Sequence, residues 1–126
     1  MSGHSDLHGV RVLLVEDNTQ LRRIMGKSLT SLGCEVTAAA NAADALAAMA
    51  GAAEYDLLLS DVRMPGSMDG IQLAEESTRL RPQMAVLLQT GFYDESTGRF
   101  TTLNKPFSLD ELVDAVRSVL PSKPQY

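Results

Sequence analysis

Short apolar runs alternate with longer segments of helical spacing along most of the chain. Where apolar residues recur every three or four positions, we expect helices, at residues 19–32, 70–81 and 109–120 and in an alanine-rich stretch between Asn41 and Gly51. The five short runs are expected as strands, at residues 10–15, 34–39, 55–60, 84–89 and 101–104. Since these strands are nearly continuously apolar and alternate with helices, the pattern predicts a parallel sheet covered on both faces.

The connection between the fourth and fifth strands is unusually short. It contains 11 residues, 90–100, with two glycines and almost no aliphatic side chains. A complete crossover with its helix needs at least about 10–12 residues. The predicted fold is therefore a flavodoxin-like, doubly wound α/β fold with a five-stranded parallel sheet of order 2-1-3-4-5 and a shortened or missing fourth helix.

Both ends of the chain lack this alternation. Residues 1–9 are small and polar, and residues 121–126 contain two prolines. We expect a flexible N-terminal tail over 1–9, one folded domain over 10–120 and a C-terminal tail over 121–126. The total of 126 residues is typical of a single domain with its own core.

Composition narrows the function classes. There are 16 acidic and 11 basic residues, a net charge of −5 without a Lys/Arg cluster, so we expect no nucleic-acid partner. The single cysteine, Cys34, excludes a disulfide framework or a paired-cysteine zinc site and is interpreted as a small buried hydrophobe. No apolar run approaches the roughly 18 residues of a membrane span, and no secretory signal is visible, which predicts a cytoplasmic protein without membrane contact of its own.

Three acidic residues follow neighbouring strands of the predicted sheet. Glu16 and Asp17 come after the first strand, and Asp61 comes after the third. In the order 2-1-3-4-5 these strands are adjacent, and ligands of open α/β sheets bind beyond the carboxyl ends of such strands. Three crowded carboxylates repel one another unless a cation joins them, and their oxygen ligands suit Mg²⁺.

Thr90 follows the fourth strand and Lys105 the fifth. They place a hydroxyl donor and a fixed positive charge on the rim of the same crevice. Carboxylate, Mg²⁺, hydroxyl and ammonium together suit an incoming phosphoryl group, which an aspartate can accept as an acyl phosphate.

At these positions the chain resembles the receiver domain of two-component response regulators, over roughly residues 10–120. Five motifs carry the resemblance in the order of the strands: V-L-L-V-E-D-N at 12–18, L-L-L-S-D-V-R-M-P at 57–65, M-D-G at 68–70, Q-T-G at 89–91 and N-K-P-F at 104–107. The resemblance implies that Asp61 is the phospho-acceptor. It also implies a cis peptide bond between Lys105 and Pro106.

The resemblance assigns the other site residues as well. Glu16 and Asp17 hold Mg²⁺, together with Asp61 and the backbone carbonyl of Arg63. Thr90 donates a hydrogen bond to the phosphoryl group, and Lys105 pairs with its charge.

The implied function is signal transduction. The domain accepts a phosphoryl group from a sensor histidine kinase or a histidine phosphotransfer protein in a Mg²⁺-dependent reaction, and it switches or relays the signal. It is not a conventional enzyme, although it catalyses its own phosphorylation and dephosphorylation. The oligomeric state is left open, with a monomer as one alternative.

The chain departs from the family at two further places. Thr102 stands where receivers usually carry a switch aromatic, and the loop after residue 64 has one residue more than the commonest form, as in receivers of hybrid sensor kinases. Two alternatives therefore stay open: a phosphate sink or relay without conformational output, and a non-phosphorylated pseudo-receiver that acts as a binding module. A nucleotide-binding domain is disfavoured because the turn after the first strand has no glycine. A Mg²⁺-dependent phosphatase is disfavoured because Arg63 stands where a second aspartate is needed.

Overall fold

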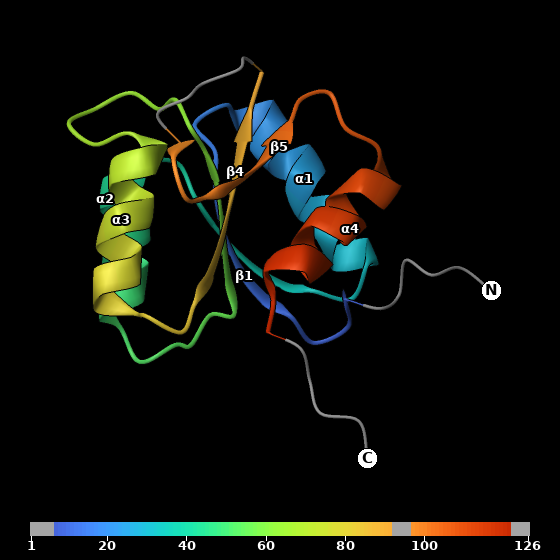
Figure 1. Ribbon diagram of the computed structural model, residues 1–126, viewed down its shortest axis with the longest axis horizontal. Helices are drawn as coiled ribbons and strands as arrows, with labels where there is room; N and C mark the ends of the chain where they lie inside the picture. The colour runs from blue at the N-terminus through green and yellow to red at the C-terminus, as the bar shows by residue number, and fades with distance from the viewer. Residues whose placement is uncertain (1–6, 92–96, 122–126) are drawn as a thin grey trace.

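The fold is an α/β sandwich of three layers, seen in a computed structural model that describes residues 7–91 and 97–121 (Figure 1). Its elements, in chain order, are β1 (Arg11–Val15), α1 (Thr19–Ser31), β2 (Glu35–Ala39), α2 (Ala42–Ala50), β3 (Leu57–Asp61), α3 (Gly70–Leu80), β4 (Ala85–Thr90), β5 (Thr101–Asn104) and α4 (Leu109–Val119). Each lies within two residues of its predicted bounds.

The sheet has five parallel strands in the order β2-β1-β3-β4-β5, as the sequence predicted. Helices α1 and α4 cover one face, and α2 and α3 cover the other (Figure 1). In the described residues there are four α-helices, and Gly91 and residues 97–100 of the β4–β5 connection belong to none of them. The rest of the predicted short crossover, residues 92–96, lies outside the described residues.

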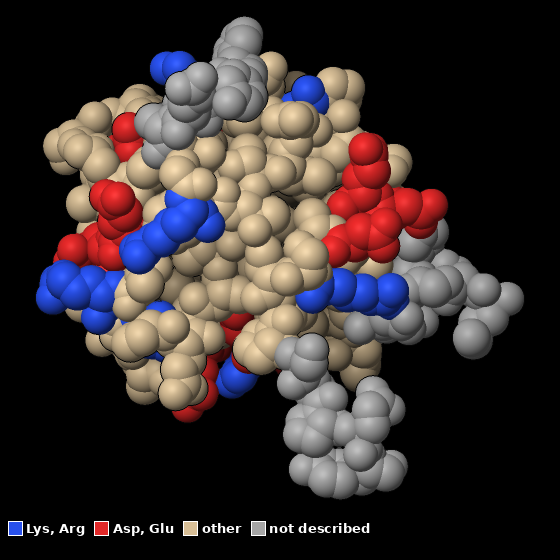
Figure 2. Space-filling view, in the orientation of Figure 1, with Lys and Arg blue, Asp and Glu red and all other residues tan. Residues whose placement is uncertain are grey.

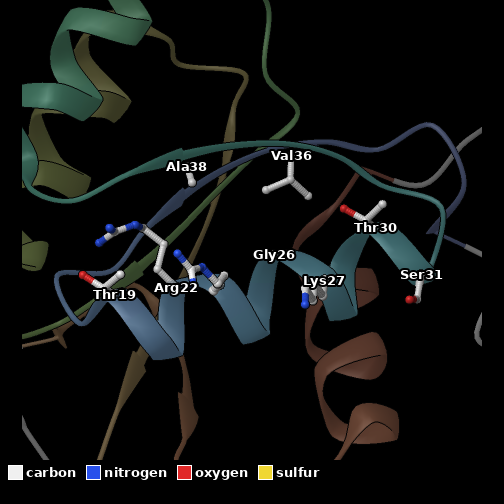
Figure 3. Close-up of a pocket in the computed structure, with 9 residues that line it drawn as sticks. Thr19, Arg22, Gly26, Lys27, Thr30, Ser31, Val36 and Ala38 are labelled. Carbon is white, nitrogen blue, oxygen red and sulfur yellow. The ribbon is translucent and has the colours of Figure 1, made fainter.

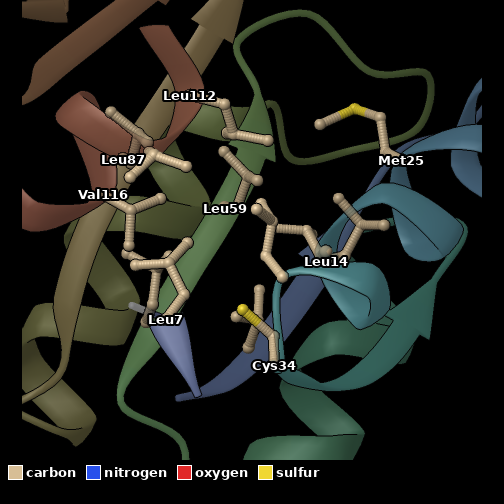
Figure 4. Packing of buried hydrophobic residues seen from close by; sticks show 13 residues of the cluster. Leu7, Leu14, Met25, Cys34, Leu59, Leu87, Leu112 and Val116 are labelled. Atoms are coloured by element: carbon tan, nitrogen blue, oxygen red, sulfur yellow. The ribbon is translucent and has the colours of Figure 1, made fainter. Parts of the chain in front are cut away.

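The core forms two layers because side chains alternate along each strand. On the face covered by α1 and α4, Leu14, Leu59 and Leu87 lie in one row across β1, β3 and β4 (Figure 4). Leu13 and Leu58, one residue earlier, pack instead against α2 and α3. All five are fully buried, so the sheet is held by apolar packing on both faces.

Polar residues at the helix ends fix where helices begin. The Asn18 side chain accepts a hydrogen bond from the Leu21 N–H at 2.9 Å and caps α1. Ser108 and Glu111 form a capping box at the start of α4. These caps satisfy backbone donors that helices leave unpaired, and they place the strand-to-helix loops that carry the site.

The described part of the predicted N-terminal tail packs against the domain. Leu7 is 1% exposed and belongs to the core beside Cys34 (Figure 4). The N–H of Gly9 donates to the carbonyl of Gly33 at 2.8 Å. Gly33 has φ +95°, and a Cβ there would lie 2.7 Å from the backbone of His8. Packing thus begins earlier than residue 10, where the apolar pattern begins, and the bounds of the domain stay a prediction.

The peptide bond between Lys105 and Pro106 is cis, which confirms the prediction. None of the helices in the described ranges has the length and apolarity to cross a membrane.

Candidate functional site

An acidic cluster lies at the carboxyl ends of β1 and β3, which are neighbours in the sheet. Carboxylate oxygens of Glu16, Asp17 and Asp61 all lie within 4.8 Å of one another. The structure thus brings together the three predicted acids. Such a set of hard oxygen donors fits a divalent cation such as Mg²⁺, whose charge offsets the repulsion between the carboxylates.

Glu16 is the most enclosed member of the cluster, with 1% of its surface exposed. Its Oε2 accepts a hydrogen bond from the Asn18 N–H at 3.1 Å. Its Oε1 lies 3.4 Å from both the Gln89 side-chain amide and the Lys105 ammonium. Burial raises the pKa of Glu16, and the neighbouring Asp61 charge raises it further, while Asn18 and Lys105 oppose the shift. The ionised form of Glu16 therefore depends on the donors and cations around it.

Lys105 contacts two members of the acidic cluster. Its Nζ lies 3.1 Å from Asp61 Oδ2 and 3.4 Å from Glu16 Oε1. The Lys105 backbone N–H donates to the Thr90 carbonyl at 2.8 Å, which ties the end of β5 to the end of β4. The ammonium is consequently held next to the carboxylate that the sequence predicts as the acceptor.

Thr90 and Arg63 are the remaining predicted site residues. Thr90 ends β4 and is 2% exposed, and Arg63 is exposed in the loop that follows β3. Both positions lie at the carboxyl edge of the sheet, Thr90 at the end of β4 and Arg63 two residues after the end of β3. Their predicted contacts with a phosphoryl group and with Mg²⁺ stay predictions.

Gly70 is a site residue whose role the sequence did not reveal. It begins α3, and its N–H donates to the Val62 carbonyl at 2.9 Å. A Cβ at Gly70 would lie 1.8 Å from the carbonyl oxygen of Asp61. Only glycine allows α3 to start this close to the aspartate. The M-D-G motif contained this signal. Glycine is unfavourable in a helix, so its presence at the start of one indicates a steric requirement.

Gln89 is the second such residue. It is a fully buried polar side chain at the end of an otherwise apolar strand, and it pairs in register with Asp61. Its backbone carbonyl accepts from the Val62 N–H at 2.9 Å. The polar residue after the apolar run 84–88 was a visible signal, but only the 3.4 Å contact from its Nε2 to Glu16 Oε1 shows that it faces Glu16.

A cavity of about 720 Å³ opens between α1 and the loop that precedes α4. Its lining includes Lys105 and Gln89 from the site and the exposed apolar side chains Ile24 and Leu109. The site therefore adjoins a partly apolar surface that two helices share.

Charged side chains elsewhere are distributed without one dominant sign on the face shown in Figure 2, where Lys and Arg form separate groups among acidic residues. The chain as a whole carries a net charge of −5. That face offers no continuous basic surface of the kind that holds a phosphate backbone.

Comparisons with known proteins agree with this geometry. Residues 12–117 match the family described as the response regulator receiver domain. The receiver protein CpdR of Brucella abortus is 36% identical over 117 residues, which cover 87% of this chain and 96% of CpdR. The regulator NtrC of Escherichia coli is 34% identical over 116 residues, but these cover only 24% of NtrC.

Solved structures give the same result. A response regulator receiver protein from Sinorhizobium medicae superimposes with a TM-score of 0.81 at 29% identity, covering 90% of this chain and 95% of that one. TrrA of Thermotoga maritima, solved in complex with Mg²⁺-BeF, has a TM-score of 0.78 at 27% identity, covering 88% of this chain and 99% of TrrA.

The family match extends over most of the chain, and the fold and the acidic cluster are those that the family resemblance implied. The chain belongs to the response regulator receiver domain family of two-component signalling.

Proposed function

We propose that this domain accepts a phosphoryl group on Asp61 from a phosphohistidine donor and thereby relays or switches a signal. One observation carries the proposal: Asp61 lies both within the three-carboxylate cluster and 3.1 Å from the Lys105 ammonium. A carboxylate between a cation site and a fixed ammonium is suited to attack an anionic phosphorus centre.

In the proposed step, a carboxylate oxygen of Asp61 attacks the phosphorus and forms a P–O bond. The P–N bond to the donor histidine breaks, and its electron pair stays on the imidazole nitrogen. Lys105 pairs with the phosphoryl charge, and the Thr90 hydroxyl donates a hydrogen bond to a phosphoryl oxygen. Hydrolysis of the acyl phosphate by water later regenerates the Asp61 carboxylate.

Mg²⁺ is the proposed cofactor, held by Glu16, Asp17, Asp61 and the backbone carbonyl of Arg63. When bound, it supplies positive charge that neutralises the phosphoryl oxygens. The clustered carboxylates support this assignment, since without a cation they would repel an incoming anion.

Phosphorylation by a small donor tests the proposal directly. Protein incubated with Mg²⁺ and acetyl phosphate should gain one phosphoryl group by intact-protein mass spectrometry, and chelation of Mg²⁺ should abolish the gain. Asp61→Asn should remain unlabelled, while Asp114→Asn, an exposed change on α4, should be labelled like the wild type. Labelling of Asp61→Asn at the wild-type level would refute the assignment.

The proposed protein partner is a sensor histidine kinase or a histidine phosphotransfer protein that docks on α1 and the loop after β5. Helix α1 carries Arg22, Arg23 and Lys27 and no acidic residue. These three side chains line a cavity of about 660 Å³ between α1 and β2, with Gly26 at the helix surface between them (Figure 3). This basic surface lies on the helix that leads away from the acidic cluster.

Charge reversal separates docking from chemistry. Arg23→Glu and Lys27→Glu should slow transfer from the cognate kinase and leave acetyl phosphate labelling unchanged, because both side chains are exposed and absent from the acidic cluster. Equal loss in both reactions would contradict a docking role.

A relay or sink without conformational output is the second candidate, and Thr102 favours it. This residue lies on β5, paired in register with Leu88, and its hydroxyl contacts the Phe100 carbonyl at 3.4 Å. A threonine offers no ring to reposition when the site is phosphorylated. Amide chemical shifts measured with and without a beryllofluoride mimic test the choice: changes confined to the acidic crevice favour the relay, and changes that extend along β5 and α4 favour the switch.

A further inference from the structure

Gln89 occupies an unusual position in the sheet. It is fully buried, and it follows Leu87 by two residues, so its side chain lies on the face covered by α1 and α4. In register it pairs with Asp61 on β3 and Leu103 on β5. It is the polar residue at which the apolar core of this face meets the acidic crevice.

Its two amide atoms have different surroundings. Nε2 lies 3.4 Å from Glu16 Oε1, and Oε1 is buried without a hydrogen-bond partner in the described part of the chain. A buried acceptor without a partner destabilises the folded state, because the water that it loses is not replaced. An apolar side chain of similar length, such as methionine, would avoid this loss. The contact that glutamine makes here, and that methionine would not make, is the one from Nε2 to Glu16 Oε1.

The contact of Gln89 Nε2 is with a member of the acidic cluster. Glu16 Oε1 has two donors, the Gln89 amide and the Lys105 ammonium, and Lys105 also contacts Asp61. A phosphoryl group on Asp61 adds negative charge next to that ammonium and attracts it away from Glu16. The Gln89 amide then stays as the side-chain donor to this oxygen.

We infer that Gln89 is a positioning residue that holds the Glu16 carboxylate in place for Mg²⁺ while Lys105 turns to the phosphoryl group. A neutral amide suits this task better than a second cation, since it orients the carboxylate without cancelling the charge that attracts Mg²⁺. The inference rests on the proposed Mg²⁺ site and on the proposed role of Lys105.

The test replaces Gln89 with methionine, which keeps the length and removes both amide atoms. Gln83→Met, at an exposed glutamine before β4, is the matched control. Mg²⁺ affinity is measured by isothermal titration calorimetry, and stability of the Mg²⁺-free protein by urea unfolding. We expect Gln89→Met to bind Mg²⁺ about tenfold more weakly, with a urea midpoint equal to or above that of the wild type.

Kinetics supply a second readout. In acetyl phosphate labelling, Gln89→Met should raise the Mg²⁺ concentration for half-maximal rate by the same factor as its weaker binding. The rate at saturating Mg²⁺ should stay within about twofold of the wild type. The orientation of the Glu16 carboxylate affects Mg²⁺ binding rather than the labelling step that follows once Mg²⁺ is bound. Gln89→Leu repeats both measurements with a side chain of different shape and should give the same result.

Unchanged Mg²⁺ affinity in both Gln89 variants would overturn the inference. A fall in the urea midpoint that parallels the loss of affinity would also overturn it, since this would indicate a purely structural role. Absence of Mg²⁺ binding or of labelling in the wild type would instead refute the proposed function, so the two failures are distinguishable.

Discussion

The acidic cluster at the ends of β1 and β3 and the edge strand β5, which β4 separates from β3, differ in how closely their residues are packed. In the crevice, Glu16 is fully enclosed and has three donors to its carboxylate, and Asp61 is held next to the start of α3. Strand β5 is four residues long, lies at the edge of the sheet and contains no fully buried residue. Glu16 and Asp61 thus lie in a closely packed part of the fold, whereas β5 is a short strand at its edge.

This contrast has a functional meaning. The proposed phosphoryl transfer depends on closely positioned charged groups, and Glu16 and Asp61 lie at the ends of buried strands. Signal output requires an element with two packed arrangements of similar free energy. At β5 the usual aromatic is replaced by Thr102, while Phe100 packs partly buried against the core of α2 and α3. We therefore expect substitutions on β5 to affect signal output more than the proposed phosphoryl transfer.

The largest expected effect is at Gly70, where α3 begins next to Asp61. Gly70→Ala would place a methyl group 1.8 Å from the Asp61 carbonyl, so α3 must shift. We expect a loss of roughly 3 kcal/mol or more in the free energy of unfolding, measured by urea denaturation.

Gly26→Ala is the matched control for that change. Gly26 also lies in a helix, but a Cβ there meets no atom within 4 Å. Alanine should therefore stabilise the protein by about 0.5–1 kcal/mol through helix propensity. Similar destabilisation by both substitutions would contradict the close packing at Asp61.

Glu16→Gln should change the stability of the protein less than Gly70→Ala does, and in the opposite direction. It removes a buried charge from a cluster of like charges, so the Mg²⁺-free protein should gain stability. Mg²⁺ should raise the unfolding midpoint of the wild type and have little effect on the variant. Loss of stability on this substitution would mean that the donors to Glu16 outweigh its burial and the repulsion.

The same residue predicts a pH dependence. Because the pKa of Glu16 is raised in the folded state, its protonated form is favoured by folding. Its contribution is therefore stabilising at pH values below the ordinary pKa of 4.5 and is lost as the pH rises through the raised value. Unfolding midpoints of wild type and Glu16→Gln, compared from acidic to neutral pH, should diverge in favour of the variant as the pH rises.

The smallest effect is expected at Thr102 on the edge strand β5. Thr102→Tyr should leave acetyl phosphate labelling within about twofold of the wild type, because Thr102 hydrogen-bonds the Phe100 carbonyl rather than the acidic cluster. With a beryllofluoride mimic, the variant should show larger amide shift changes along β5 than the wild type. A large loss of labelling would show that this edge supports the chemistry after all.

Much of the architecture followed from local patterns. Apolar runs and helical spacing predicted all nine elements within two residues, because burial in a parallel sheet imposes those patterns directly on the chain. The acids at strand ends predicted the crevice for a related reason: in a parallel sheet the carboxyl ends of neighbouring strands meet at one edge. Glu16, Asp17, Asp61 and Lys105 could thus be grouped before any distance was known.

Other features were decided by the tertiary structure alone. The collision that excludes a side chain at Gly70, the amide of Gln89 facing Glu16 and the burial of Leu7 each depend on contacts between separate segments of the chain. Such contacts depend on strand register and on how closely each helix packs, and neither leaves a periodic trace in the chain. The sequence by itself predicted that the three acids and Lys105 meet at one edge of the sheet, and the tertiary structure decided which neighbours, such as Gly70 and Gln89, lie against them.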